Sequence, residues 1–242
     1  MEEKIIPILM YHSIQNVPKT ETMRSLHVKP RAFAFQMWIL KTLGYRGCSV
    51  SEVVAAFNNN SSEKLVGLTF DDGYENFYHN ALPILRNFKF SATVYCVSDL
   101  IGKDNEWDRD TGISRNPLMN DEQIWTCLQE GIEIGCHTAT HKSLTAKDVD
   151  FHQEITAAKT TLENRFNNNI ASFCYPYGHV NENIEAFLGD TGFTSATTMI
   201  RARAKQIDNH LLLPRIPITW HTFPHLYLAK ILSNYEDRRR HS

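Results

Sequence analysis

The sequence lacks three features that would each indicate a particular class of protein. No apolar run approaches the ~18 residues of a membrane-spanning helix, so we predict no transmembrane segment. There is no excess of positive charge: 25 Lys and Arg against 27 Asp and Glu argue against a non-specific nucleic-acid binder. There is also no CxxC spacing. The cysteines are expected to be reduced, buried thiols, which favour a cytoplasmic protein: Cys48, Cys96, Cys127, Cys136 and Cys174.

The first residues do not show the pattern of a secretory signal. Residues 1–4 lead into a short apolar stretch, residues 5–10, with no small-residue cleavage site after it. We therefore expect a cytoplasmic protein. The alternative is an exported form whose signal has been removed. No repeat, low-complexity block or long linker interrupts the sequence. We expect one catalytic domain over residues 1–242.

The hydrophobic pattern alternates between expected strands and expected helices. The strands are expected at residues 5–11, 65–70, 91–97, 132–136, 171–175, 193–197 and 211–218. The helices are expected at residues 33–43, 76–88, 121–130, 148–166, 181–188 and 223–235. This alternation predicts an α/β fold with parallel strands and crossover helices, either a barrel or a doubly wound sheet.

Side chains that could take part in catalysis or binding lie at the ends of four expected strands: Tyr11-His12, Asp71-Asp72, His137 and Pro176-Tyr177. In parallel α/β folds the carboxyl ends of the strands converge on one rim, where active sites form. One shared site explains this placement better than chance.

A metal ion would explain why two carboxylates stand side by side in "LTFDDG". Asp71 and Asp72 repel each other when both are ionised, and a dication cancels that repulsion. His137 and His141 are four residues apart, so in a helical turn they would share one face. One carboxylate and two histidines make a catalytic zinc-type site, which leaves the other carboxylate free as a base. The alternatives are a simple strand-to-turn Asp-Asp-Gly and solvated histidines.

The segments "LTFDDGYENFYHNALPILRNFKFSATVY", "IGCHTATHKSL" and "SFCYPYG" resemble the successive motifs of the polysaccharide deacetylases, the NodB-homology carbohydrate esterases. The resemblance covers roughly residues 5–220. It implies a distorted (β/α) barrel and metal-dependent removal of an N- or O-acetyl group from a sugar. The expected substrate is an N-acetylhexosamine-containing glycan or glycan precursor.

The resemblance also assigns roles to the motif residues. It implies that Asp71 is the general base, and that Asp72, His137 and His141 bind one divalent metal ion, usually zinc and sometimes cobalt, nickel or iron. The backbone N–H of Tyr177, after Pro176, is expected to complete an oxyanion hole.

The sequence departs from the family pattern at two places. Cys174 stands where the third motif usually has an arginine, and the usual late Leu-x-His motif is absent. These gaps fit the poly-N-acetylglucosamine deacetylase branch, whose first strand ends in a Tyr-His pair, here in "PILMYHSI". His12 is therefore the expected general acid, opposite Asp71. Arg215 either replaces the absent arginine or forms a surface ion pair.

Other assignments stay open. Tyr177 and Trp220 could stack on a sugar ring or pack in the core. The run Arg238-Arg239-Arg240 is expected to be a frayed, solvated tail, with weak contact to a membrane surface as the alternative. Two other functions compete with the deacetylase: a metal-dependent phosphoesterase, and a non-catalytic glycan-binding protein on the same fold.

Overall fold

The computed structural model describes residues 3–240, and strands and helices alternate along it as predicted. The strands are β1 (Ile5–Ile6), β2 (Ile8–Tyr11), β3 (Ser13–Ile14), β4 (His27–Val28), β5 (Arg46–Cys48), β6 (Leu65–Phe70), β7 (Thr93–Cys96), β8 (Glu133–Cys136), β9 (Ser172–Cys174), β10 (Ser195–Arg201), β11 (Ala204–Lys205) and β12 (Leu213–Pro217). The helices are α1 (Pro30–Thr42), α2 (Val50–Asn58), α3 (Leu82–Phe88), α4 (Asp121–Gln129), α5 (Ala158–Phe166), α6 (Glu182–Gly189) and α7 (Pro224–Leu232). Two π-helical segments, η2 (Phe77–Ala81) and η5 (His152–Ala157), lead directly into α3 and α5.

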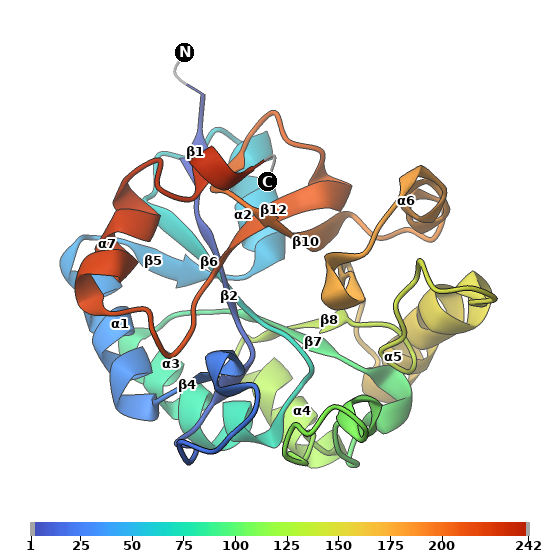
Figure 1. Ribbon diagram of the computed structural model, residues 1–242. Coiled ribbons are helices and arrows are strands. Elements are labelled where there is room, and N and C mark those ends of the chain that lie inside the picture. Colours follow the sequence, from blue (N-terminus) through green and yellow to red (C-terminus); the bar gives the residue numbers. More distant parts are fainter. Residues whose placement is uncertain (1–2, 241–242) are drawn as a thin grey trace.

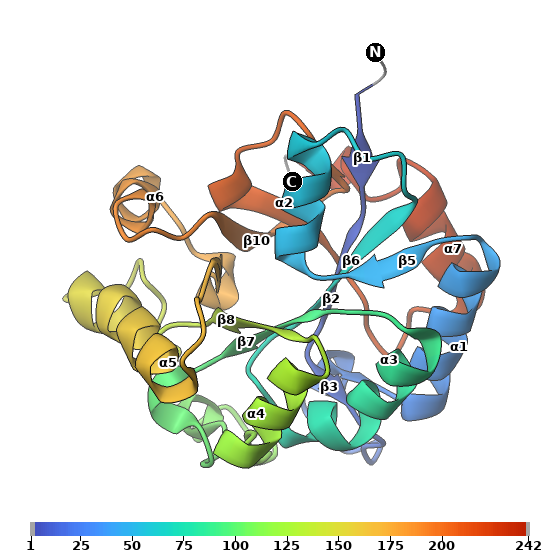
Figure 2. The ribbon, with the colours of Figure 1, turned by 180° about the vertical axis from the view of Figure 1, so that it is seen from behind.

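The main strands close into a parallel barrel. Going round the ring, the neighbours are β2, β12, β10, β9, β8, β7 and β6, and β6 pairs again with β2. The helices lie outside this ring (Figure 1). The barrel is distorted at β6, since β5 pairs with the first half of β6 and β7 with its second half (Figure 2). The predicted distorted (β/α) barrel is therefore confirmed.

The parallel arrangement brings the functional side chains to one rim. Every residue of β6 is buried, as expected for a strand covered on both faces. Tyr11 of β2 is in register with Phe70 of β6, so the residues that follow them emerge at the same level. The carboxyl ends of β8, β9 and β12 lie on the same rim because all the ring strands run in one direction.

Several helix boundaries differ from the prediction. The sequence pattern missed β5 and α2, although Ser49 and Glu52 form a capping box at the start of α2. The helices expected at residues 76–88 and 148–166 each contain a π-helical segment before the α-helix begins. Such segments are rare and occur often at functional sites.

The arginines at the end of the described chain are not a frayed tail, so that expectation is wrong. Asp237–Arg239 form a helical turn, η8. Arg240 forms an ion pair with Asp208, with Nη1 at 2.7 Å from Oδ1, and also donates to the carbonyl of Arg203. The guanidinium of Arg239 lies over the ring of Tyr235 at 4.4 Å. This packing ties the segment to the barrel.

Two other predictions concern the composition. All five cysteines are buried and unpaired, as predicted. Within residues 3–240, none of the helices is long and apolar enough to cross a membrane.

Gly135, two residues before His137 in β8, is packed too closely for a side chain. A Cβ there would lie 2.5 Å from Cδ1 of Tyr95 and 2.9 Å from the carbonyl oxygen of Ser172. We predict that Gly135→Ala lowers the free energy of unfolding by about 1–3 kcal/mol, the usual cost of overpacking. Urea denaturation measures this change. Gly189→Ala, in α6, is the matched control, because the nearest neighbour of its Cβ would be 3.6 Å away, and it should not lower the free energy of unfolding.

Candidate functional site

The two adjacent carboxylates after β6 face different partners. Asp72 has a φ of +74° and Gly73 a φ of +72°, so the chain turns sharply at the end of the strand. Asp is among the residues that tolerate this left-handed conformation. The turn separates the carboxylates: Asp71 faces an arginine, and Asp72 faces two histidines. The sequence left two alternatives for Asp-Asp-Gly, a simple turn or part of a site. In the structure the same turn also directs the two carboxylates to their different partners.

Asp72, His137 and His141 bring three ligand atoms together. Asp72 Oδ1 lies 3.5 Å from Nε2 of His137 and 3.3 Å from Nε2 of His141, and all three side chains are buried. Nδ1 of His137 donates to the carbonyl oxygen of Cys174 at 2.7 Å, which leaves the Nε2 lone pair toward Asp72. The three ligand atoms lie within 4.8 Å of one another. This donor set fits a divalent ion such as zinc and leaves positions for water and substrate.

The expected helical turn between His137 and His141 is wrong. The segment is an irregular loop in which Thr138 has a φ of +66° and His141 a φ of +62°. The N–H of His141 donates to Oγ1 of Thr138 at 2.9 Å and closes the loop. The imidazoles meet, with ring centroids 4.8 Å apart, because of this closed loop.

Arg215, from β12, binds Asp71 through both terminal nitrogens. Nη1 lies 2.6 Å from Oδ1, and Nη2 lies 2.8 Å from Oδ2. The side chain of Arg215 is 1% exposed and that of Asp71 is 4% exposed, which excludes the surface ion pair considered for Arg215. Burial acts to raise the pKa of Asp71, but the charge and hydrogen bonds of the guanidinium outweigh it and hold the pKa below its ordinary value. Asp71 is therefore kept ionised.

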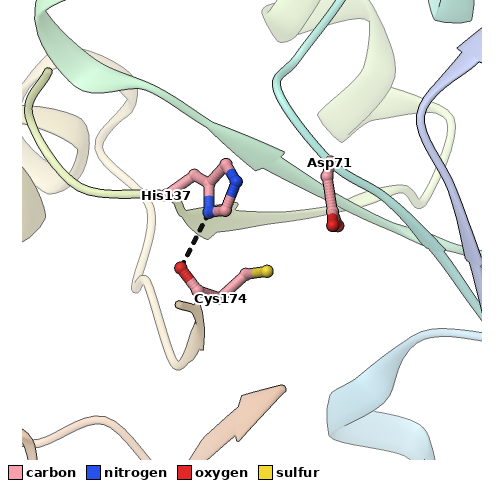
Figure 3. Close-up of side chains that lie close together, drawn as sticks. All are labelled: Asp71, His137 and Cys174. Atoms are coloured by element: carbon pink, nitrogen blue, oxygen red, sulfur yellow. Dashed lines mark hydrogen bonds between the residues drawn. The ribbon is translucent and has the colours of Figure 1, made fainter. Parts of the chain in front are cut away.

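Cys174 lies against this pair. Its Sγ is 3.2 Å from Nη2 of Arg215, so a small side chain occupies the place where the family resemblance puts an arginine. Figure 3 shows the side chains of Asp71, His137 and Cys174 around one space, and their ligand atoms also lie within 4.8 Å of one another. Both oxygens of Asp71 already accept from the guanidinium, so a cation bound there would face positive charge. The set that contains Asp72 is therefore the better ion site.

His12 lies beside Asp71 rather than opposite it, so that part of the expectation is wrong. Its Nε2 is 3.8 Å from Oδ2 of Asp71, and 20% of its side chain is exposed. The two residues are neighbours because they follow β2 and β6, which pair in the ring. The imidazole still opens on the cavity, where a ligand can reach it.

The π-helical segment η2 and Asn76, the residue just before it, hold the chain directly after His12. Asn76 accepts from the N–H of Ile14 at 2.8 Å and donates to Oγ of Ser13 at 3.0 Å. Asn80 donates to the carbonyl oxygen of Ile14 at 2.8 Å. These side chains follow the "DDG" turn in sequence, so one segment carries the carboxylates and also positions the backbone beside the imidazole.

The polar groups line a cavity of about 350 Å³. Apolar side chains from several separate segments form much of the rest of the lining: Met23, Leu26, Trp107, Ile113, Tyr177 and Met199. Asp108 also lines the cavity, and burial followed by the nearby charge of Asp72 raises its pKa. Trp107 and Asp108 could not be located from the sequence because they lie in a segment with no hydrophobic period. Trp107 stacks on His141, with ring centroids 4.4 Å apart.

The residues proposed to contact a sugar have different surroundings. Tyr177 has a φ of +59° after the buried Pro176, lines the cavity, and is 47% exposed as a residue. Among residues 3–240, no acceptor is found for the Tyr177 N–H. Trp220 does not line the cavity; its ring lies under the guanidinium of Arg24 at 3.9 Å, so its expected stacking role is not supported.

Comparison with known proteins relates the chain to one family. Residues 58–196 match the family model described as polysaccharide deacetylase. YxkH of Bacillus subtilis, a protein named for this family, is 28% identical over 217 residues, which are 88% of this chain and 71% of that protein. The poly-beta-1,6-N-acetyl-D-glucosamine N-deacetylase of Staphylococcus aureus is 24% identical over 168 residues. That alignment covers 68% of this chain and 58% of the length of the relative.

A solved structure gives a similar result. The Streptococcus pyogenes deacetylase PplD in complex with acetate has a TM-score of 0.82 and 28% identity, and the match covers 95% of this chain and 99% of that one. IcaB from Ammonifex degensii, with a TM-score of 0.78 and 21% identity over 93% of this chain and 97% of that one, supports the fold alone.

We predict that Arg215→Met destabilises the protein most at neutral pH. The change leaves Asp71 buried without a counter-charge, at a cost of about 3–5 kcal/mol. In the wild type the pKa of Asp71 is lowered, so the pair stabilises the fold above the ordinary carboxyl pKa, and this contribution is lost as the pH falls through the folded value. In the variant the buried carboxyl binds a proton already at moderately acid pH. The unfolding free energies should therefore differ most near pH 7 and converge toward acid.

The control for Arg215→Met is the double variant Asp71→Asn/Arg215→Met, which removes both charges. Urea denaturation should show that it recovers much of the stability lost near pH 7. A single variant as stable as the wild type at that pH would contradict a stabilising role for the pair.

Proposed function

The chain belongs to the polysaccharide deacetylase family, and from this premise we propose that it hydrolyses an N-acetyl group from an N-acetylhexosamine-containing glycan or glycan precursor. The observation that carries the proposal is one cavity lined by both the ligand set of Asp72, His137 and His141 and the Asp71–Arg215 pair. Hydrolysis of an amide needs an activated water, a polarised carbonyl and a proton for the leaving nitrogen. These groups are suited to the task.

We propose that Asp72, His137 and His141 hold one divalent ion, with zinc first and cobalt, nickel or iron as alternatives. Two imidazole nitrogens and one carboxylate oxygen are donors that zinc prefers. An ion bound there would supply a Lewis acid toward the acetyl carbonyl and lower the pKa of water. Its charge would also offset the repulsion between the adjacent aspartates.

Asp71 acts as the base in this proposal. Arg215 keeps it ionised and fixes its orientation through two hydrogen bonds. Each carboxylate oxygen has a second lone pair, so Asp71 can accept a proton from the attacking water without releasing the guanidinium. The expectation that Arg215 replaces the missing motif arginine is supported by this geometry.

His12 and Tyr177 are proposed to act on the leaving nitrogen and on the developing oxyanion. An amine anion is a very poor leaving group, so the nitrogen must be protonated as its bond to the acetyl carbon breaks. The Nε2 of His12 opens on the cavity and is the proposed donor of that proton. The N–H of Tyr177 has no acceptor among residues 3–240 and is the proposed donor to the developing oxyanion.

The proposed substrate class is supported by the names of two related proteins. One is an N-deacetylase of poly-beta-1,6-N-acetyl-D-glucosamine, and the other is a deacetylase whose structure contains acetate. The test is acetate release from acetylated monosaccharides, short oligomers and nucleotide sugars, each assayed with added zinc, cobalt, nickel or iron. O-acetylated sugars in the same assay separate ester from amide cleavage. Phosphate release from phosphate esters, without any acetate release, would favour the phosphoesterase instead.

We predict that Asp72→Ala, His137→Ala and His141→Ala each abolish metal binding and acetate release, because three protein ligands leave no spare. Asp71→Asn should keep the metal and lose turnover, since an amide cannot accept the proton of water. Metal content measured by mass spectrometry distinguishes the two classes of variant. If Asp71→Asn lost metal as completely as Asp72→Ala, the division of roles would be wrong.

We predict that His12→Ala keeps the metal and loses roughly 10²–10⁴-fold in kcat on an amide substrate, the usual scale for a general acid. The loss should be smaller for an activated ester, whose leaving group departs without a proton. His221→Ala is the control, because this exposed histidine does not line the cavity. Equal losses on amide and ester, or a selective loss in the His221 variant, would rule out His12 as the acid.

A further inference from the structure

The loop that carries His141 needs support from outside. Two of its residues that are not glycine, Thr138 and His141, have left-handed backbone conformations. Such conformations cost about 1–3 kcal/mol each and persist only where the surroundings hold them. The bond from the His141 N–H to Thr138 lies within the loop and does not fix the loop relative to the barrel. Part of this support comes from the N–H groups of Ser98 and Asp99, which donate to the carbonyl oxygens of Thr138 and Ala139 at 3.1 Å.

Glu154 supplies further support from the π-helical segment η5. Its carboxylate accepts from the N–H of Thr140 at 3.0 Å and from the Oγ1 of Thr140 at 2.6 Å. Its backbone carbonyl accepts from the N–H of Ala139 at 3.1 Å. Glu154 is 2% exposed, so both carboxylate oxygens depend on these donors rather than on water. One residue therefore holds two consecutive peptides of the loop.

The two histidines of the ligand set are oriented in different ways. His137 donates its Nδ1 proton to a backbone carbonyl, the usual arrangement for a metal-binding histidine. The Nδ1 of His141 is buried and has no hydrogen-bond partner among residues 3–240. Its ring instead stacks on Trp107 and meets the ring of Tyr177 edge-on, at centroid distances of 4.4 and 4.9 Å. Packing limits the tilt of the ring, but the position of its backbone depends on the loop.

We propose that Glu154 is a positioning residue that sets the zinc affinity of the site by fixing the loop before His141. This inference rests on the proposed function, because it requires that the Asp72-His137-His141 set binds an ion. The carboxylate suits this role since both of its oxygens accept hydrogen bonds, whereas an amide offers only one acceptor oxygen. The nearest cation, Lys142 Nζ, is 4.0 Å away on a side chain that is 65% exposed, so the loop donors are its main partners.

The experiment measures the dissociation constant of Zn²⁺ alone by competition with a fluorescent chelator. Glu154→Gln should bind zinc 10–100-fold more weakly than the wild type, the range for groups that orient metal ligands. Thr140→Val removes one hydroxyl donor and keeps the N–H bond, so it should weaken binding by a smaller factor. If Glu154→Gln does not fold, Thr140→Val carries the test.

Glu133→Gln is the matched control. Glu133 accepts hydrogen bonds from the N–H of Ser51 at 3.2 Å and from Oγ1 of Thr93 at 2.5 Å. These bonds are of the same kind as those of Glu154, but they lie at the opposite end of β8 from His137. The Glu133→Gln variant should have a lower melting temperature than the wild type, and its zinc affinity should change less than twofold. Equal weakening by Glu133→Gln and Glu154→Gln, or wild-type affinity in Glu154→Gln, would overturn the positioning role and leave the metal site intact. A wild-type protein that binds no zinc would overturn the metal site itself, and the inference with it.

Discussion

The bidentate ion pair between Asp71 and Arg215 is the interaction on which the rest of the site depends. A carboxylate at the end of a buried strand would normally bind a proton, because burial penalises its charge. The guanidinium reverses that tendency, and the negative charge that it stabilises is the one that the proposed base needs. The pair also joins β6 to β12, two strands separated in the ring by β2 alone. Its geometry therefore ties the proposed base to the closure of the barrel.

The order of strands in the ring explains how the site is divided. His12, Asp71 and Arg215 come from or directly follow three successive strands of the ring, β2, β6 and β12, with β2 in the middle, and they form the proposed acid–base side. The two histidines of the proposed ligand set follow β8, on the other side of β7. Asp72 faces them because the left-handed turn directs it away from its neighbour. Two adjacent carboxylates can thus serve two functions without sharing a position.

Most of the barrel could be predicted from the sequence, because long apolar runs and helix stops are local signals. The motif residues could also be located, since polar groups at strand ends stand out against those runs. The histidine loop could not, because its conformation depends on Glu154 and on aromatic rings from distant segments. Trp107 could not be located because its segment has no hydrophobic period, and β5 could not because a three-residue strand has too little periodicity to detect. The register of β2 against β6, which brings His12 beside Asp71, is likewise a tertiary property.

The position of Arg215 in the chain has a consequence for synthesis. It follows Asp71 by 144 residues, so a ribosome completes all of β6 to β10 before the partner of this carboxylate exists. Contacts of such large sequence separation form late, since the intervening chain must lose its freedom first. Until β12 inserts between β10 and β2, the barrel is open and Asp71 has no counter-charge. The last strand of the ring to be made therefore both closes the fold and converts Asp71 into a stable buried anion, which couples the maturation of the site to completion of the barrel.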